Sequence, residues 1–140
     1  MTTWVIDASV AVKWALPEKD REAYQGQALA LLHDLQEGHC QVLQPPHWLA
    51  EMAAVLTRLA PTQSIALLQT FLAMEFPVST EWEVYEQACR LAVDLRHHLR
   101  DTLYHAVALQ SSVCVFVTAD TQYFRKAARF GHIIELKDFL

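Results

Sequence analysis

Two short apolar segments of the chain each end in an aspartate, one near the beginning of the sequence and the other near its end. The first is Trp4-Val5-Ile6-Asp7, and the second runs from Val113 to Asp120. Both are rich in β-branched and aromatic residues and precede helix-like sequence, so we expect two buried strands that each lead into a helix. Open α/β sheets bind their ligands at the carboxyl ends of such strands. Two carboxylates that meet there repel each other, and a cation relieves that repulsion, so the pair indicates a metal site.

The rest of the chain alternates short strand candidates with longer helix candidates. We expect strands at residues 4–6, 41–44, 76–79, 113–117 and 132–135. We expect helices at residues 8–16, 18–37, 47–59, 61–74, 80–95, 101–110 and 121–129. Pro77 favours an edge position for its strand, and Thr80 with Glu83 predicts a capping box for the following helix. The alternation predicts an α/β fold, a three-layer α/β/α sandwich with a parallel sheet, as one domain over residues 1–140.

The composition favours a globular protein with a substantial core. Hydrophobic residues make up 53% of the chain, and only 3 glycines and 5 prolines are present, which argues against disorder. No apolar run approaches the roughly 20 residues that cross a bilayer, and no secretory signal is evident, so we expect no membrane association. The 3 cysteines are widely spaced and form no C-x-x-C pair, which favours reduced thiols and a cytoplasmic location.

The charge balance restricts the kind of nucleic-acid protein that this chain could be. There are 11 basic and 16 acidic residues, which give a net charge of −5. A passive nucleic-acid binder normally has a basic excess, so that class is disfavoured. An enzyme that acts on nucleic acid stays open, because acids that bind metal ions add negative charge that the ions then offset.

Several acids have both a structural and a functional interpretation. Asp7, Asp101 and Asp120 each precede a helix, where an aspartate often caps free backbone N–H groups. For Asp7 and Asp120 together, their shared position at strand ends favours function over capping. Glu51 lies in an otherwise apolar helix, so it either faces solvent or reaches inward. We interpret Asp94 as a surface residue.

Histidines cluster in sequence around the acids that helices carry, at positions His47, His97, His98 and His105. The compact H-E-x-x-H pattern of zinc enzymes is absent. Oxygen ligands dominate the candidate site, and that chemistry suits Mg²⁺ or Mn²⁺ better than Zn²⁺. We interpret the histidines as packing or rim residues. His105, four residues after Asp101 on the same helical face, is the strongest candidate for an exception.

Four segments, taken in order, resemble the PIN domain family, and most closely its toxin ribonucleases of the VapC type. They are residues 5–14, the Glu51 segment with Pro45-Pro46 before it, residues 100–104 and residues 117–120. Each is a weak motif alone, whereas all four in this order in a chain of this length form a specific pattern. The resemblance implies a short sheet of about five parallel strands with acids gathered at one end.

The resemblance also implies site residues and an activity. The residues that match the family's catalytic, metal-binding quartet are Asp7, Glu51, Asp101 and Asp120. Ser9 and Thr118 match its small hydroxyl positions, which support the acids by hydrogen bonding. The implied activity is a metal-dependent endoribonuclease that uses one or two Mg²⁺ or Mn²⁺ ions and leaves 5′-phosphate and 3′-hydroxyl ends. Lys13 either contacts a substrate phosphate or is an ordinary exposed helix lysine.

The partners that the resemblance implies are an RNA substrate, a cognate antitoxin protein and a second copy of the chain. In this interpretation the protein is the toxin of a type II toxin–antitoxin pair. Apolar residues in the middle of the chain are candidates for the surface of a homodimer: Trp48, Leu67, Leu68, Phe71 and Leu72.

Other functions compatible with the sequence are a non-catalytic PIN-like module that binds RNA or protein, and a different magnesium-dependent α/β enzyme that processes phosphate groups. An aspartate-nucleophile phosphatase would need a D-x-D motif after the first strand, where this chain has Ser9. A phospho-acceptor receiver would need a further acid pair beside Asp7 and a late lysine after a strand, and neither is evident. The complete set of four acids disfavours a module that has lost catalysis.

Overall fold

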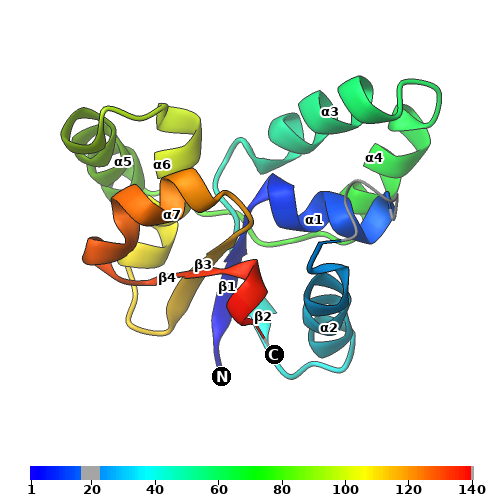
Figure 1. Ribbon diagram of the computed structural model, residues 1–140, viewed down its shortest axis with the longest axis horizontal. Helices are drawn as coiled ribbons and strands as arrows, with labels where there is room; N and C mark the ends of the chain where they lie inside the picture. Colours follow the sequence, from blue (N-terminus) through cyan, green and yellow to red (C-terminus); the bar gives the residue numbers. More distant parts are fainter. Residues whose placement is uncertain (17–22, 140) are drawn as a thin grey trace.

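The computed structural model describes residues 1–16 and 23–139, and in this part of the chain a parallel sheet lies between helices (Figure 1). The strands are β1 (Thr3–Ile6), β2 (Gln41–Val42), β3 (Cys114–Thr118) and β4 (Ile133–Glu135). Their order across the sheet is β2-β1-β3-β4, and every neighbouring pair is parallel. The predicted α/β architecture is confirmed, with four strands among the described residues in place of about five.

Helices connect the strands and cover both sides of the sheet. The described α-helices are α1 (Ala8–Ala15), α2 (Gln25–Gln36), α3 (Trp48–Leu59), α4 (Ser64–Ala73), α5 (Trp82–Leu95), α6 (Leu99–Leu109) and α7 (Thr121–Ala127). On one side α6 packs against β1 and β3, and α5 packs against α6. On the other side α1 contacts β3, and α2 and α3 pack against α1. Figure 1 shows α5, α6 and α7 to the left of the sheet and α1 to α4 to its right.

The pairing of β1 with β3 brings the two aspartate-terminated segments together. Ile6 lies opposite Val117 in this parallel register, so the residues that follow them also become neighbours. The Asp7 backbone N–H donates to the Val117 carbonyl at 3.1 Å and extends the ladder by one bond. Val5, Ile6 and Val117 are at most 1% exposed, as expected for strands covered on both faces. The prediction of two buried strands that lead into helices is therefore confirmed.

The expected strand at residues 76–79 is reduced to a single bridge, between Gln44 and Val78. The Gln44 N–H donates to the Pro77 carbonyl and the Ser79 N–H donates to the Gln44 carbonyl, both at 2.9 Å. Pro77 has no N–H of its own, which limits further pairing. Beyond the end of β2, the Gln44 side chain supplies the hydrogen bonds to β1. Its amide oxygen accepts from the Ile6 N–H at 2.8 Å, and its amide nitrogen donates to the Ile6 carbonyl at 2.9 Å.

Several predicted helix boundaries need correction. The helix expected from residue 101 begins at Leu99 with His98 as its N-cap, so Asp101 lies inside the first turn. The helix after β3 is also shorter than expected, since α7 gives way to a 3₁₀ turn at Ala128–Phe130. The predicted capping box of Thr80 is wrong, because Glu81 is the N-cap of α5 and no side chain caps that helix.

The second predicted helix, 18–37, lies partly outside the described residues, because residues 18–22 are not described. In the described part, α2 starts only at Gln25, after a turn in which Tyr24 has a left-handed backbone conformation with φ 62°. Left-handed conformations are unfavourable inside a helix, so the chain cannot continue helically through this residue. The expected helix is therefore shorter at its start.

The apolar residues proposed for a dimer surface are divided between the core and the surface. Trp48 and Phe71 are 6% and 2% exposed, so they belong to the core. Phe71 stacks on Trp14, and Trp48 packs at a tilt against Phe76. Leu72 is 58% exposed and remains available at the surface. In the described part of the chain, no helix has both the length and the apolar character needed to cross a bilayer.

Candidate functional site

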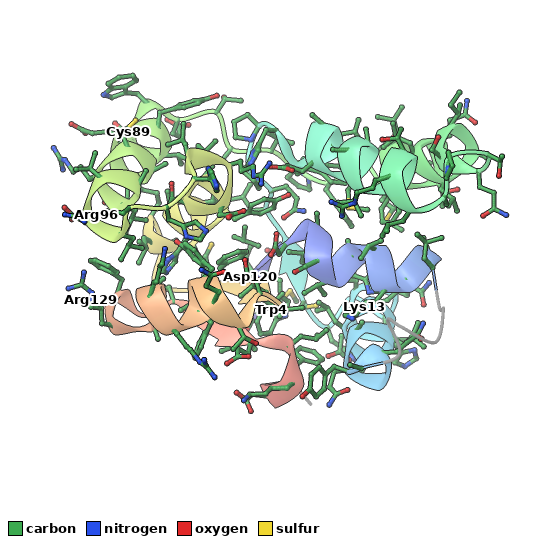
Figure 2. All side chains as sticks on the ribbon, turned by 45° about the horizontal axis from the view of Figure 1, so that its top comes forward. Trp4, Lys13, Cys89, Arg96, Asp120 and Arg129 are labelled. Carbon is green, nitrogen blue, oxygen red and sulfur yellow. The ribbon has the colours of Figure 1, made fainter. Side chains whose placement is uncertain are left out.

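The four acids matched from the sequence line one pocket of about 410 Å³ at the carboxyl end of the sheet. Asp7 follows β1 and Asp120 lies just beyond β3, while Glu51 projects from α3 and Asp101 from the first turn of α6. Figure 2 shows Asp120 near the centre of the molecule, between Lys13 on α1 and Arg96 beside α5. Residues separated by more than a hundred positions in the sequence therefore meet in one place because the two central strands are parallel neighbours.

Asp7 is fixed by hydroxyl groups from both central strands. The Ser9 hydroxyl donates to Asp7 Oδ2 at 2.8 Å, and the Thr118 hydroxyl donates to the same oxygen at 2.7 Å. Asp7 is the N-cap residue of α1 but its side chain makes no capping bond, so the simple capping interpretation is wrong for this residue. Because both hydroxyls bind Oδ2, the second carboxylate oxygen keeps its lone pairs for another partner.

The pKa of the Asp7 carboxyl is raised from 3.8 to about 6, chiefly by burial. The negative charges of Asp101 and Asp120 contribute to this rise, whereas the hydrogen bonds from Thr118 and Ser9 act in the opposite direction. The ionised form of Asp7 is therefore unfavourable while the pocket holds only its own acids. A cation bound in the pocket would stabilise the ionised carboxylate and lower the pKa of Asp7.

Asp120 combines capping with a place at the pocket. Its Oδ1 accepts from the Tyr123 N–H at 3.1 Å, so the capping interpretation is correct for this aspartate. The Asp120 N–H donates to the Thr118 hydroxyl at 3.0 Å, and the Ala119 N–H donates to the Ser9 hydroxyl at 3.0 Å. These hydroxyls thus connect the backbone after β3 to the Asp7 carboxylate, and the two strand ends form one hydrogen-bonded unit.

Asp101 is held by His97, for which the sequence predicts only a packing or rim role. His97 Nε2 lies 2.6 Å from Asp101 Oδ2, and Lys126 Nζ lies 3.1 Å from His97 Nδ1. Lysine can only donate, so Nδ1 accepts and Nε2 carries the proton that it donates to Asp101. In the described part of the chain, His97, Asp101 and Asp120 each bring a possible ligand atom within 4.8 Å of the others.

Glu51 is tied to the start of α6 through His47. Glu51 Oε1 lies 3.6 Å from His47 Nε2, and the same nitrogen donates to the Arg100 carbonyl at 2.7 Å. The Glu51 side chain is 20% exposed and faces the pocket, which resolves the choice between solvent and interior in favour of the interior. Among the described residues, His47 Nδ1 is a buried nitrogen without a hydrogen-bond partner.

Tyr104 is a buried residue whose electrostatics reflect the nearby acids. Its ring is 1% exposed and lies 5.0 Å from the His47 ring between centroids. Burial raises the pKa of Tyr104 above its usual range, and the charges of Asp7, Glu51 and Asp101 raise it further. The phenol therefore stays protonated, and its ring packs between His47 and Phe116.

His105 has a packing role, although the sequence made it the strongest candidate among the histidines for a role in the site. It is fully buried, with Nε2 donating to the Gly131 carbonyl at 2.7 Å and Nδ1 accepting from the Tyr123 hydroxyl at 3.0 Å. Burial lowers the pKa of His105, so the ring is neutral. Neither nitrogen is available to the pocket, and His105 does not line it.

Three cationic side chains share the pocket with the four acids: Lys13, Arg58 and Arg100. Lys13 is 8% exposed, so the interpretation of an exposed helix lysine is wrong. Arg58 and Arg100 are exposed on α3 and α6. The pocket therefore presents carboxylates with positive charges around them, an arrangement suited to a metal ion together with a phosphate group.

The histidine that contacts Asp101 precedes α6, whereas His105 lies inside this helix. Asp101 reaches back to His97 at the start of the helix. His105 is held in the core by the Tyr123 hydroxyl and the Gly131 carbonyl. The spacing of four residues between His97 and Asp101, like that between His47 and Glu51, was the available signal.

Comparisons with known proteins agree with this geometry. A family model described as the PIN domain matches residues 4–130, which includes all four acids. No match is found among curated proteins. PIN domains are usually magnesium-dependent nucleases, and the acids gathered at the carboxyl end of this parallel sheet fit that family. The chain belongs to the PIN domain family.

Proposed function

We propose that the protein is a metal-dependent endoribonuclease that hydrolyses RNA phosphodiester bonds in the carboxyl-end pocket. The observation that supports this most strongly is the meeting of the four acids in one pocket, with Asp7 fixed by two hydroxyl donors. Neither a packed core nor a set of helix caps requires that arrangement. The family membership supports nuclease chemistry, and the restriction to RNA and to internal bonds is part of the proposal.

The donor set fits Mg²⁺ or Mn²⁺. The residues that would hold one or two ions are Asp7, Glu51, Asp101 and Asp120. Carboxylate oxygens are the ligands that these hard ions prefer, whereas a zinc site would need imidazole or thiolate ligands. His97 donates to Asp101 with one nitrogen and accepts from Lys126 with the other, so it supports a carboxylate instead of replacing one.

Mg²⁺ or Mn²⁺ bound here would lower the pKa of a water molecule and offset the charge that develops on the phosphate during hydrolysis. The chain's own groups do the positioning. Ser9 and Thr118 hold the Asp7 carboxylate in one orientation, and His97 does the same for Asp101. Arg58 and Arg100 offer planar guanidinium donors that can pair with phosphate oxygens.

The finer proposal is that this enzyme is the toxin of a type II toxin–antitoxin pair. It is supported by the similarity of the ordered segments to VapC-type toxins. The carboxylates would accept an arginine side chain from a cognate antitoxin, because guanidinium pairs with carboxylate in a bidentate geometry. Expression of the protein should then arrest the growth of a bacterial host, and Asp7→Asn should relieve the arrest. Arrest by both forms would contradict this role.

A homodimer is part of the same proposal. Ile65 and Leu72 on α4 are 76% and 58% exposed, and they are candidates for an interface between two copies. Sedimentation at micromolar protein concentration should give a dimer that Leu72→Glu weakens. A monomer for the wild-type protein would remove this part of the proposal without affecting the nuclease.

The test of the proposed activity is RNA cleavage followed by analysis of the product ends. Wild-type protein should cut RNA in Mg²⁺ or Mn²⁺, leave 5′-phosphates and 3′-hydroxyls, and lose activity in a chelator. Asp7→Asn and Asp120→Asn should abolish cleavage at equal protein concentration. Undiminished cleavage by both variants would show that the site is wrong, and RNA binding without cleavage in any divalent metal would favour the non-catalytic module.

A further inference from the structure

A second pocket lies directly beside the acids. It has a volume of about 420 Å³, and its walls are Ala92, Arg96, His97, His98, Gln122 and Lys126. These residues come from the end of α5, the link between α5 and α6, and α7. In Figure 2, Arg96 lies at the end of α5, to one side of Asp120. We call this hollow the basic pocket and the one with the four acids the acidic pocket.

His97 forms the wall between the two pockets. Its Nε2 donates to Asp101, which lines the acidic pocket, and its Nδ1 accepts from Lys126, which lines the basic pocket. The His97 side chain is 9% exposed, so it is a packed part of the protein and not a mobile surface group. The basic pocket therefore starts one side chain away from the candidate site of hydrolysis.

The charge of the basic pocket is opposite to that of the chain as a whole. The protein carries a net charge of −5, yet Arg96 and Lys126 line this pocket without any carboxylate among its lining residues. Within the part of the chain that the structure describes, neither cation takes part in an ion pair. Arg90 on the same helix, in contrast, is paired with Glu86 at 3.1 Å.

We propose that the basic pocket binds a backbone phosphate of the RNA strand next to the phosphate that is cleaved. The proposal rests on the proposed ribonuclease function and adds a binding subsite to it. A strand whose scissile phosphate lies among the acids must continue past one rim of the acidic pocket. Arg96 supplies a forked guanidinium and Lys126 a point charge, the two groups that proteins use for phosphate.

An acidic protein has a particular need for such a subsite. RNA binding depends largely on the pairing of phosphates with lysine and arginine, and the overall charge of this chain is unfavourable for it. Positive charge concentrated in one pocket raises the local potential and attracts the strand despite the net charge. His98 and Gln122 add further hydrogen-bond donors that can bind phosphate or ribose oxygens.

The experiment compares Arg96→Gln with Arg90→Gln. Both changes remove one positive charge from the same region of α5, but only Arg96 lines the basic pocket. Binding of a single-stranded RNA oligonucleotide is measured at several salt concentrations on an Asp7→Asn background, which prevents cleavage. Arg96→Gln should weaken binding about fivefold or more and reduce the slope of log K against log salt by about 0.7, whereas Arg90→Gln should change neither.

Two further arms distinguish a phosphate subsite from a structural role and from failure of the enzyme proposal. Arg96→Lys should restore the salt slope, because lysine keeps the charge, while recovering only part of the affinity. In the cleaving protein, Arg96→Gln should raise KM more than it changes kcat. Equal binding by the Arg96→Gln and Arg90→Gln proteins would overturn the subsite even if cleavage is normal. Absence of RNA cleavage by the wild-type protein would overturn the proposed function, while the binding comparison would still decide on the pocket.

Discussion

The two ends of the same parallel sheet each carry a pocket, and the larger one lacks the chemistry. The amino-end pocket is about 590 Å³ and is lined mostly by apolar or small side chains around Thr3, Cys40 and Val113, with Glu75 as its one acid. The acidic pocket at the carboxyl end is about 410 Å³ and contains four acids and three cations. Pocket size alone would therefore point to the wrong end of this molecule.

The difference follows from the direction of the strands. At the carboxyl end, β1 and β3 both lead into helices, and the amino-terminal ends of α1 and α7 favour negative charge near them. At the amino end, the strands begin from loops such as the turn before Cys114, and the walls bury apolar surface. A parallel sheet thus gives its two ends unequal electrostatics before any side chain is chosen.

The strongest test of this comparison uses two variants, each of which removes one negative charge from one end of the sheet. Asp7→Asn is close to isosteric, and its amide oxygen can still accept from Ser9 and Thr118, so the fold should persist. We expect RNA cleavage to fall by about 10³-fold or more, equivalent to about 4 kcal/mol of transition-state stabilisation. Glu75→Gln in the amino-end pocket should cleave like the wild type. Initial rates at saturating Mg²⁺ give the comparison, which equal losses in both variants would refute.

The pH dependence of stability should also differ between the two ends. The pKa of Asp7 is raised from 3.8 to about 6, so its protonated form is favoured by folding. This contribution is fully present below pH 4 and is lost as the pH rises through 6, by about 3 kcal/mol in total. Without metal, Asp7→Asn should therefore be more stable than the wild type at pH 7.5 and similar to it at pH 4.

Urea unfolding in the presence of a chelator at both pH values measures this effect. Glu75→Gln provides the control at the opposite end, where the side chain is exposed. It should follow the wild-type pH profile. The difference in unfolding free energy between Asp7→Asn and the wild type should change between the two pH values. A constant difference would show that ionisation of Asp7 does not destabilise the folded protein.

Addition of a divalent metal should offset the destabilisation caused by ionised Asp7. An ion that binds only the folded protein stabilises it by RT ln(1 + [L]/Kd), or about 2.7 kcal/mol at a hundredfold excess over Kd. Mn²⁺ should therefore raise the melting temperature of the wild type at pH 7.5. It should raise that of Asp120→Asn much less, because this variant loses a ligand at the carboxyl end, while Glu75→Gln should respond like the wild type. An equal shift in all three proteins would indicate metal binding elsewhere.

The sequence was sufficient to predict the elements that carry the site. The apolar runs at β1 and β3 predicted buried strands. In the structure these strands pair in parallel, with Ile6 opposite Val117. The alternation of strands and helices also predicted the layer architecture. Local pattern succeeds here because a strand covered on both faces must be apolar throughout.

What the sequence could not supply were contacts set by tertiary packing. The bonds from Thr118 to Asp7 and from Lys126 to His97 join residues that only the completed sheet brings together. The strand expected at residues 76–79 became a single bridge to Gln44, because Pro77 has no N–H with which to extend the pairing. Helix starts were also misplaced, since Asp101 resembles a capping residue but lies within the first turn of α6.

The smallest expected effect compares a histidine at each end. His97 fixes Asp101 at the carboxyl end, whereas His132 Nδ1 lies 2.9 Å from the Cys114 carbonyl at the amino end. Loss of an outer-shell partner of a metal ligand typically lowers activity or metal affinity by 10–100-fold, so His97→Ala should reduce cleavage about tenfold and weaken Mn²⁺ binding. His132→Asn should leave both unchanged, because asparagine tolerates the φ of 56° at this position and keeps a donor.

A rescue variant distinguishes positioning from general damage at His97. In His97→Gln the terminal amide can still donate to Asp101 from near the place of Nε2, although it presents no acceptor where Nδ1 met Lys126. We expect it to recover most of the Mn²⁺ affinity lost in His97→Ala. If glutamine and alanine are equally defective while both remain folded, then the bond from Lys126, and with it the wall between the two pockets, matters more than the orientation of Asp101.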